Sequence, residues 1–112
     1  MSYDISFKVK VEGVDAYVRV GNCNANITWN ARKVIELSTG LPWENEANNG
    51  LCLDVIPKIQ HGLTELETNG EKYLPFGTVV GTIMFFKQIL DDWADLVKWN
   101  EKLVPVVTFW IE

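Results

Sequence analysis

The feature that most constrains the fold is a stripe of large apolar side chains in the last third of the chain. Its members recur at helical spacing: Ile83, Phe86, Ile89, Leu90, Trp93, Leu96 and Val97. Such spacing places side chains on one side of an α-helix. Because a stripe this wide must be buried against other elements, it predicts a long core helix that begins after Gly77.

The first 21 residues have the pattern of a β-hairpin. Apolar residues alternate with more polar ones on both sides of a turn at residues 12–15: Ile5, Phe7, Val9, Val11, Ala16, Val18 and Val20. Alternation at period two predicts strands with one buried face, and the short turn predicts that they pair antiparallel. The other face is expected to carry Lys8, Lys10, Tyr17 and Arg19.

The middle of the chain predicts one short and one longer helix. Apolar spacing over residues 31–38 predicts a helix that ends at Gly40, followed by a polar loop around Trp43 over residues 41–50. A second helix is expected to begin with Asp54 as its cap. Its buried stripe ends before Asn69-Gly70 and consists of Ile56, Ile59, Leu63 and Leu66.

Residues 103–111 are rich in β-branched and aromatic side chains and predict a final strand, with Pro105 at an edge or at its start. The predicted order is therefore β-β-α-α-α-β. This order is typical of an α+β fold in which a small antiparallel sheet, formed by the N-terminal hairpin and the C-terminal strand, packs with three helices on one face. The chain has 112 residues, the length of one domain, so we expect a single α+β domain over residues 1–112.

The predicted final strand is apolar on both faces, more than a one-sided sheet needs. One face would carry Val104, Val106 and Trp110, and the other Leu103, Val107, Phe109 and Ile111. The chain also contains five Trp residues, and aromatic side chains are enriched at interface cores, so we expect a homo-oligomer. The alternative is that the long helix and the loop around Trp43 cover both faces within one chain.

Composition excludes several classes of partner. The net charge of -5 arises from scattered carboxylates, and no basic stripe is present, so nucleic acid is not expected as a partner. No apolar run reaches the ~20 residues that cross a bilayer, and residues 1–4 lack the start of a signal peptide, so we expect a cytoplasmic protein without a membrane partner. Cys23 and Cys52 are then expected to be reduced, buried, small side chains rather than a metal or redox pair.

The stretch NANITWNARK, residues 24–33, is the strongest functional signal. Asn26, Thr28 and Asn30 alternate, so they would face the same way if the segment stays extended. One of them, Thr28 or Asn30, could simply cap the next helix. Arg32 and Lys33 then fall in the first helical turn, where the helix dipole disfavours cations.

A bound anion would resolve that electrostatic conflict. Free N–H groups at a helix start, together with Arg32 and Lys33, would hold a phosphate. The Asn and Thr side chains would bond a ribose or a base. The alternative is that the two cations are simply exposed to solvent.

A second segment, FGTVVGT at residues 76–82, has related properties. Gly77 and Gly81 permit close approach of a backbone, and Thr78 and Thr82 offer hydroxyl groups at the start of the long helix. The lysine of a P-loop is missing, and the glycine spacing is not that of a dinucleotide fingerprint. A turn with Thr78 or Thr82 as the helix cap explains the segment equally well.

The order of these two motifs resembles that of a group of small bacteriophage and prophage proteins in which an N-x-T-x-N element precedes a G-W-G-T-like element. The resemblance extends from Tyr3 to about Trp93 and rests on Asn26, Thr28, Asn30, Gly77, Thr78 and Gly81. Phe76 stands where the group has Trp, so an aromatic stacking role there is not implied. The group has no established activity, and the resemblance implies phage origin rather than a particular chemistry.

The sequence offers no catalytic set. His61 is the only histidine, and no serine or cysteine constellation accompanies it. Asp91 and Asp95 lie one helical turn apart, but a third metal ligand at helical spacing is missing and Lys98 can pair with Asp95. We therefore expect no enzyme activity, no metal and no cofactor.

The function expected from the sequence is capture without catalysis. A phage-encoded oligomer would sequester a small anionic ligand, expected to be a nucleotide-like host defence signal, and so act against host defence. The predicted ligand-binding residues are Asn26, Thr28, Asn30, Arg32, Lys33, Gly77 and Thr78. The alternative is a protein-interaction module that inhibits a host or defence protein through its surface, including Trp43 and Trp110. A third candidate is an enzyme acting on nucleotides.

Overall fold

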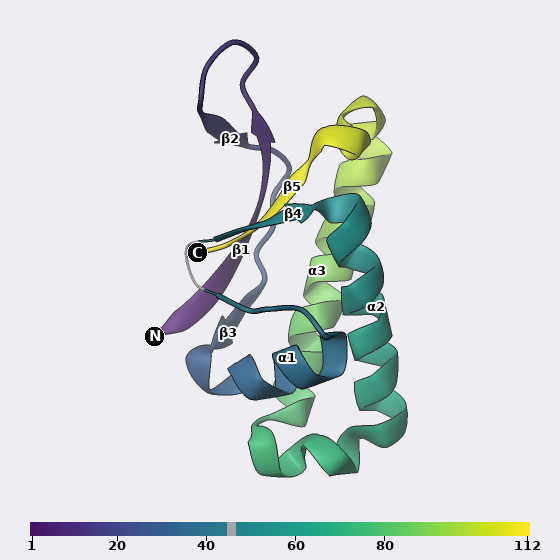
Figure 1. Cartoon of the computed structure of the whole chain (residues 1–112). Helices are drawn as coiled ribbons and strands as arrows, with labels where there is room; N and C mark the ends of the chain where they lie inside the picture. Colours follow the sequence, from purple (N-terminus) through teal and green to yellow (C-terminus); the bar gives the residue numbers. More distant parts are fainter. Residues whose placement is uncertain (45–46) are drawn as a thin grey trace.

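A computed structural model describes residues 1–44 and 47–112 of the chain. Within these residues an antiparallel sheet of five strands packs with three α-helices, which confirms the α+β prediction (Figure 1). The elements in chain order are β1 (Ser2–Lys10), β2 (Tyr17–Arg19), β3 (Asn26–Thr28), α1 (Arg32–Thr39), β4 (Ala47–Leu51), α2 (Cys52–Asn69), α3 (Val79–Trp99) and β5 (Thr108–Ile111).

Strand β1 organises the sheet, and the strands lie in the order β2-β1-β5-β4. One edge of β1 pairs with β3 near its start and with β2 near its end, while its other edge pairs with β5. The predicted hairpin is confirmed, with Lys8 opposite Arg19 and Lys10 opposite Tyr17. All three helices lie on the same face of the sheet (Figure 1).

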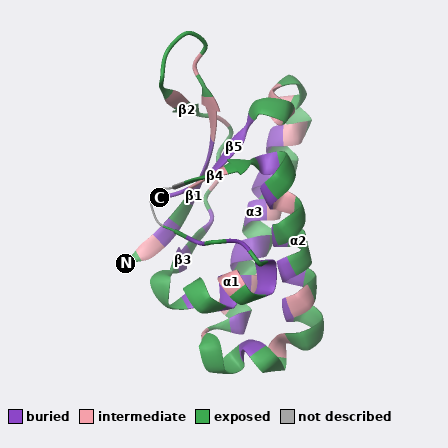
Figure 2. Cartoon of the chain, viewed as in Figure 1, coloured by how far each residue is buried: buried purple, intermediate pink, exposed green. Residues whose placement is uncertain are grey.

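The core lies between that face and the helices, where buried residues concentrate (Figure 2). Phe7 of β1 and Phe109 of β5 project into it and are fully buried. Trp43 is also fully buried, and its ring meets Phe85 of α3 and Phe109 edge to face at centroid distances of 5.9 and 6.0 Å. Edge-to-face packing is a favoured arrangement of aromatic rings. Trp43 thus joins helix α3 to the sheet.

Two short strands were missed by the sequence patterns. Strand β3 lies within the NANITWNARK stretch, and β4 lies where we expected a loop over residues 41–50, of which residues 45 and 46 fall outside the described part. The β4 sequence Ala-Asn-Asn-Gly-Leu has no apolar alternation, and its register against β5 is irregular between Asn48 and Leu51. Its pairing comes from the tertiary position of β5, which local propensity does not encode.

The final strand is shorter than predicted. Residues Glu101–Val106 form a 3-10 helix, and β5 begins only at Thr108. Pro105 explains the difference, because proline has no backbone N–H to donate to a sheet ladder. The prediction of a strand from residue 103 was therefore wrong for its first half.

The helix ends agree better with the sequence. Gly40 ends α1 in the left-handed conformation at φ 74°, and Thr78 caps α3 with its side chain. The predicted start of α2 at Asp54 was wrong, because this helix begins at Cys52 and Asp54 lies inside its first turn. There the backbone N–H of Cys52 donates to the carbonyl of Val107 at 2.9 Å, so a contact with the end of the chain, rather than a side-chain cap, precedes the helix.

Strand β5 buries apolar residues on one face, and residues of the N-terminal hairpin cover its Trp110 on the other face. Phe109 and Ile111 are fully buried against the helices. Trp110 packs edge-on against Tyr17 at 5.1 Å, and the Lys8 ammonium lies 4.6 Å from its ring centroid. Both faces of β5 are thus contacted within one chain. The outer face is contacted by hairpin residues, and not by the long helix and the Trp43 loop as one alternative expected. The homo-oligomer stays a prediction. Within the described residues, no helix combines the length and apolarity needed to cross a membrane.

Candidate functional site

The polar residues of the NANITWNARK stretch do not all share one face. Asn26 and Thr28 lie on β3, but the chain then turns into a short 3-10 helix, Trp29–Ala31, which contains Asn30. The extended conformation that would align all three residues therefore ends at Thr28. Asn26 donates hydrogen bonds from its side-chain amide to Ser2 Oγ at 3.0 Å and to Asp4 Oδ1 at 2.6 Å. These bonds fix the Asn26 side chain against β1.

Neither Thr28 nor Asn30 makes the predicted side-chain cap. Thr28 stands at the N-cap position of the 3-10 helix without a side-chain hydrogen bond, and Ala31 precedes α1. Arg32 and Lys33 occupy the first turn of α1, as expected. The Arg32 Nε lies 3.1 Å from Glu36 Oε1, one helical turn further on. This pair offsets the unfavourable position of Arg32 near the helix start without a bound anion.

Thr78 is the cap of α3, one of the two roles considered for it. Its Oγ1 accepts a hydrogen bond from the backbone N–H of Gly81 at 3.0 Å. Gly77 has a packing role, because a Cβ there would lie 2.9 Å from the carbonyl oxygen of Asn30 and 3.1 Å from the Val34 side chain. Its φ of 152° is also unfavourable for residues with a side chain. Gly77 thus lets the start of α3 approach the start of α1.

The two sequence motifs meet in one groove of about 460 Å³ between β3 and the first half of α3. From the strand side it is lined by Asn24, Ala25, Asn26, Ile27 and Thr28, and from the helix side by Thr78, Gly81, Met84, Phe85 and Gln88. Three of the predicted site residues, Asn26, Thr28 and Thr78, are therefore brought together. The remaining ones do not line it: Asn30, Arg32, Lys33 and Gly77.

An acidic hollow of about 340 Å³ shares Asn24 with this groove. It is lined by Asp92 and Asp95 of α3, and by Trp99, whose side chain is 74% exposed. Asp92 is buried, and its carboxylate accepts hydrogen bonds from the backbone N–H of Asn24 and from the Gln88 side chain, both at 2.9 Å. Asp92 therefore joins the Asn24 segment to α3.

Sequence reasoning considered Asp91 and Asp95 but missed Asp92. A signal was present, because Asp92 follows Ile89 by three residues and precedes Leu96 by four. That spacing places a carboxylate on the apolar stripe of the helix, where an unpaired charge would be costly. A polar residue at such a position predicts a specific hydrogen-bond partner, and Asn24 is that partner.

The two cysteines are free thiols. Burial raises the pKa of each thiol to about 12, with the nearby Asp92 carboxylate contributing to the rise for Cys23. Thiols with so high a pKa stay protonated near neutral pH and are poor nucleophiles. Cys52 is buried and Cys23 is partly buried, in agreement with their predicted role as small packing groups.

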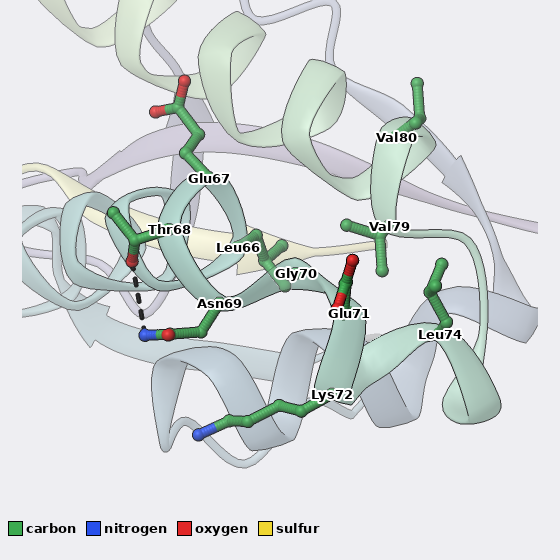
Figure 3. A pocket seen from close by; sticks show the side chains of 10 residues that line it. All are labelled: Leu66, Glu67, Thr68, Asn69, Gly70, Glu71, Lys72, Leu74, Val79 and Val80. Carbon is green, nitrogen blue, oxygen red and sulfur yellow. Dashed lines mark hydrogen bonds between the residues drawn. The ribbon is translucent and has the colours of Figure 1, made fainter.

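A third hollow, about 580 Å³, lies at the junction of α2 with α3 and contains none of the predicted site residues (Figure 3). Leu74, Val79 and Val80 lie together on one side of it (Figure 3). Its one lysine, Lys72, is paired with Glu65 at 2.9 Å, and Glu67 and Glu71 add negative charge. Nothing in this lining indicates a particular ligand.

The described residues contain no cluster of histidine, cysteine or carboxylate side chains that could hold a metal ion. His61 is exposed on α2, away from both the groove and the acidic hollow. Comparison of the chain with protein-family models, with curated proteins and with solved structures found no significant match.

Proposed function

We propose that this protein is a non-catalytic binding protein that recognises a segment of another polypeptide in the groove between β3 and α3. The observation that carries the proposal is the lining of that groove, which consists of amide, hydroxyl and apolar groups and, among the residues that line it, no charge. Asn24 and Gln88 can each donate and accept hydrogen bonds, and Met84 offers an adaptable apolar contact. Asn26 can accept a hydrogen bond through its amide oxygen, because its amide N–H groups donate to Ser2 and Asp4. Such mixed linings suit polypeptides.

The electrostatics favour a polypeptide over a phosphate-bearing ligand. The adjoining hollow contains the carboxylates of Asp92 and Asp95, and the chain has a net charge of -5. Arg32, the best candidate for a forked phosphate contact, is paired with Glu36 and lies outside the groove. An anion in the groove would therefore meet repulsion without a compensating cation.

The second candidate is the one that the sequence placed first, sequestration of a small nucleotide-like ligand. It is supported by the meeting of Asn26, Thr28 and Thr78 in one groove, because amides and hydroxyls suit a base or a sugar. Its phosphate would have to reach Lys33 outside the groove. Phage origin and an anti-defence role rest on the motif resemblance alone and stay predictions.

The two candidates are separated by selecting peptides and titrating nucleotides on the same purified protein. Octapeptides enriched from a random displayed library would be measured by calorimetry, alongside a panel of mono-, di- and cyclic nucleotides. The matched variants are Met84→Asp and Val80→Asp, since both side chains are exposed on α3, at 67% and 70%, but only Met84 lines the groove. We expect peptide binding that Met84→Asp abolishes and Val80→Asp leaves within about twofold.

Nucleotide binding that is lost in Lys33→Ala, without enrichment of any peptide, would overturn the proposal and support sequestration. Turnover of a nucleotide would contradict both candidates.

A further inference from the structure

We infer that the groove binds its polypeptide by strand addition: an extended segment pairs with the free edge of β3, and a basic residue at one end of it reaches the acidic hollow. This inference rests on the proposed function and states its binding mode. Strand addition uses main-chain hydrogen bonds for affinity and side-chain contacts for selectivity.

The pairing of β3 with β1 determines which backbone groups of β3 are free. Thr28, Ile27 and Asn26 lie opposite Ser2, Tyr3 and Asp4. Backbone bonds on either side of the strand, from Ile5 N–H to the Ala25 carbonyl at 3.2 Å and from Trp29 N–H to the Met1 carbonyl at 3.3 Å, mark the bonded pairs. Bonded and non-bonded pairs alternate in an antiparallel ladder.

Ile27 is therefore the residue of β3 whose backbone N–H and carbonyl bond to β1. The backbone N–H and carbonyl groups of Asn26 and Thr28 point away from β1. The Thr28 carbonyl lies at the N-cap position of the 3-10 helix, where a carbonyl accepts the first hydrogen bond of the helix. Three groups remain for a partner: the N–H and carbonyl of Asn26 and the N–H of Thr28. None of the described residues makes a hydrogen bond to any of them.

The groove lies along this free edge. An added strand would lie about 4.8 Å from β3 and would continue the sheet across the first half of α3. Its inward side chains would then face Met84, which is 67% exposed, and Gln88. The edge also lacks the proline, lysine or inward-pointing charge by which proteins commonly block strand addition, since its residues are Asn26, Ile27 and Thr28.

The acidic hollow determines the charge of the segment. It adjoins the groove at Asn24, beyond the end of β3, and Asp92 and Asp95 are the charged residues that line it in the described part of the chain. The exposed Trp99 ring already has the Lys98 ammonium 5.0 Å from its centroid, so the attraction for a basic residue comes from the two carboxylates. A segment that pairs with Asn26 and continues past Asn24 would therefore place a lysine or arginine there.

The sharpest test removes one backbone N–H without changing the fold. Thr28 has φ −63° and ψ 148°, which proline also adopts, and its N–H takes no part in the ladder with β1. Thr28→Pro should lower the affinity for an enriched octapeptide about tenfold or more, because a hydrogen bond is lost and the proline ring obstructs the added strand. Thr28→Ala keeps the N–H and removes only the hydroxyl group, so it should weaken binding of the octapeptide less than Thr28→Pro does.

A second measurement uses the wild-type protein, so it does not depend on the stability of Thr28→Pro. Methylating the peptide's backbone nitrogens one at a time should weaken binding at alternate positions, the signature of a strand paired along one edge. Replacing its basic residue by glutamate should weaken binding by about tenfold at low salt.

Equal binding to Thr28→Pro and wild type, together with a methylation profile without alternation, would overturn strand addition. If Met84→Asp still abolished binding, the proposed function would stand without this mode. Concentration-dependent dimerisation that is lost in Thr28→Pro would assign the β3 edge to a second copy of the chain. That result would overturn the proposal that the edge binds a basic segment of another polypeptide.

Discussion

At the scale of single residues, the molecule relies on a few polar side chains whose partners are distant in sequence. Asp92 is the clearest case, because its carboxylate accepts the N–H of Asn24, 68 residues away. Glu65 acts over a shorter stretch of chain and joins the end of α2 to the segment that follows it: it accepts a hydrogen bond from the Tyr73 hydroxyl at 2.9 Å and pairs with Lys72 at 2.9 Å. Such pairs hold segments in register that apolar contacts alone would leave free to shift.

The Glu65 contacts should make stability depend on pH. Hydrogen bonds from Lys72 and Tyr73 lower the pKa of Glu65 from 4.5 to about 2. A carboxyl group whose pKa is lowered by folding stabilises the folded state above its unfolded pKa, and this contribution is lost as pH falls from about 4.5 towards 2. We expect Glu65→Gln to melt below wild type at pH 7 and at the same temperature near pH 2.

Thermal melts from pH 7 to pH 2 would measure this difference. Glu67→Gln is the matched control, since Glu67 lies on the same helix and makes only a 3.7 Å contact with Lys87. A Glu65→Gln deficit that persists unchanged at low pH would contradict the assigned cause.

At the scale of elements, the junction between α1 and α3 depends on Gly77. We expect Gly77→Ala to destabilise the protein more than Gly13→Ala, because both glycines have a positive φ but only Gly77 has backbone and side-chain atoms in the way of a Cβ. An unfavourable backbone conformation costs about 1 to 3 kcal/mol. The contact with Asn30 adds to that cost only in Gly77→Ala.

Urea denaturation of both variants measures the comparison. Equal losses of unfolding free energy would show that the approach of α3 to Asn30 does not matter and would contradict the account of this junction.

The elements also show how far sequence patterns reach. The α3 stripe and the alternation in β1 were sufficient to predict both elements, because burial imposes their periods directly. Strands β3 and β4 are short and mostly polar, so no period marks them, and their pairing with β1 and β5 comes from tertiary contacts. The site was predicted in part for the same reason: Asn26, Thr28 and Thr78 were found by composition, whereas Met84, Gln88 and Asp92 acquire meaning only when α3 lies beside β3.

At the scale of the whole molecule, the sheet leaves one edge next to exposed residues of α3. The helices cover one face of the sheet, and β3 lies at its margin beside the first half of α3 (Figure 1). A neutral groove and an acidic hollow follow one another along α3. This arrangement offers an extended, basic segment both hydrogen-bonding partners and opposite charge.

The most direct measurement is amide hydrogen exchange of the free protein, resolved by residue with NMR. We expect fast exchange for the N–H groups of Asn26 and Thr28. We expect slow exchange for those of Ile27 and Tyr3, which lie in the ladder between β3 and β1. Addition of an enriched peptide should then slow the amide exchange of Asn26 and Thr28 selectively. Protection of Asn26 and Thr28 equal to that of Ile27 in the free protein would show that the edge is already occupied, and would contradict the account.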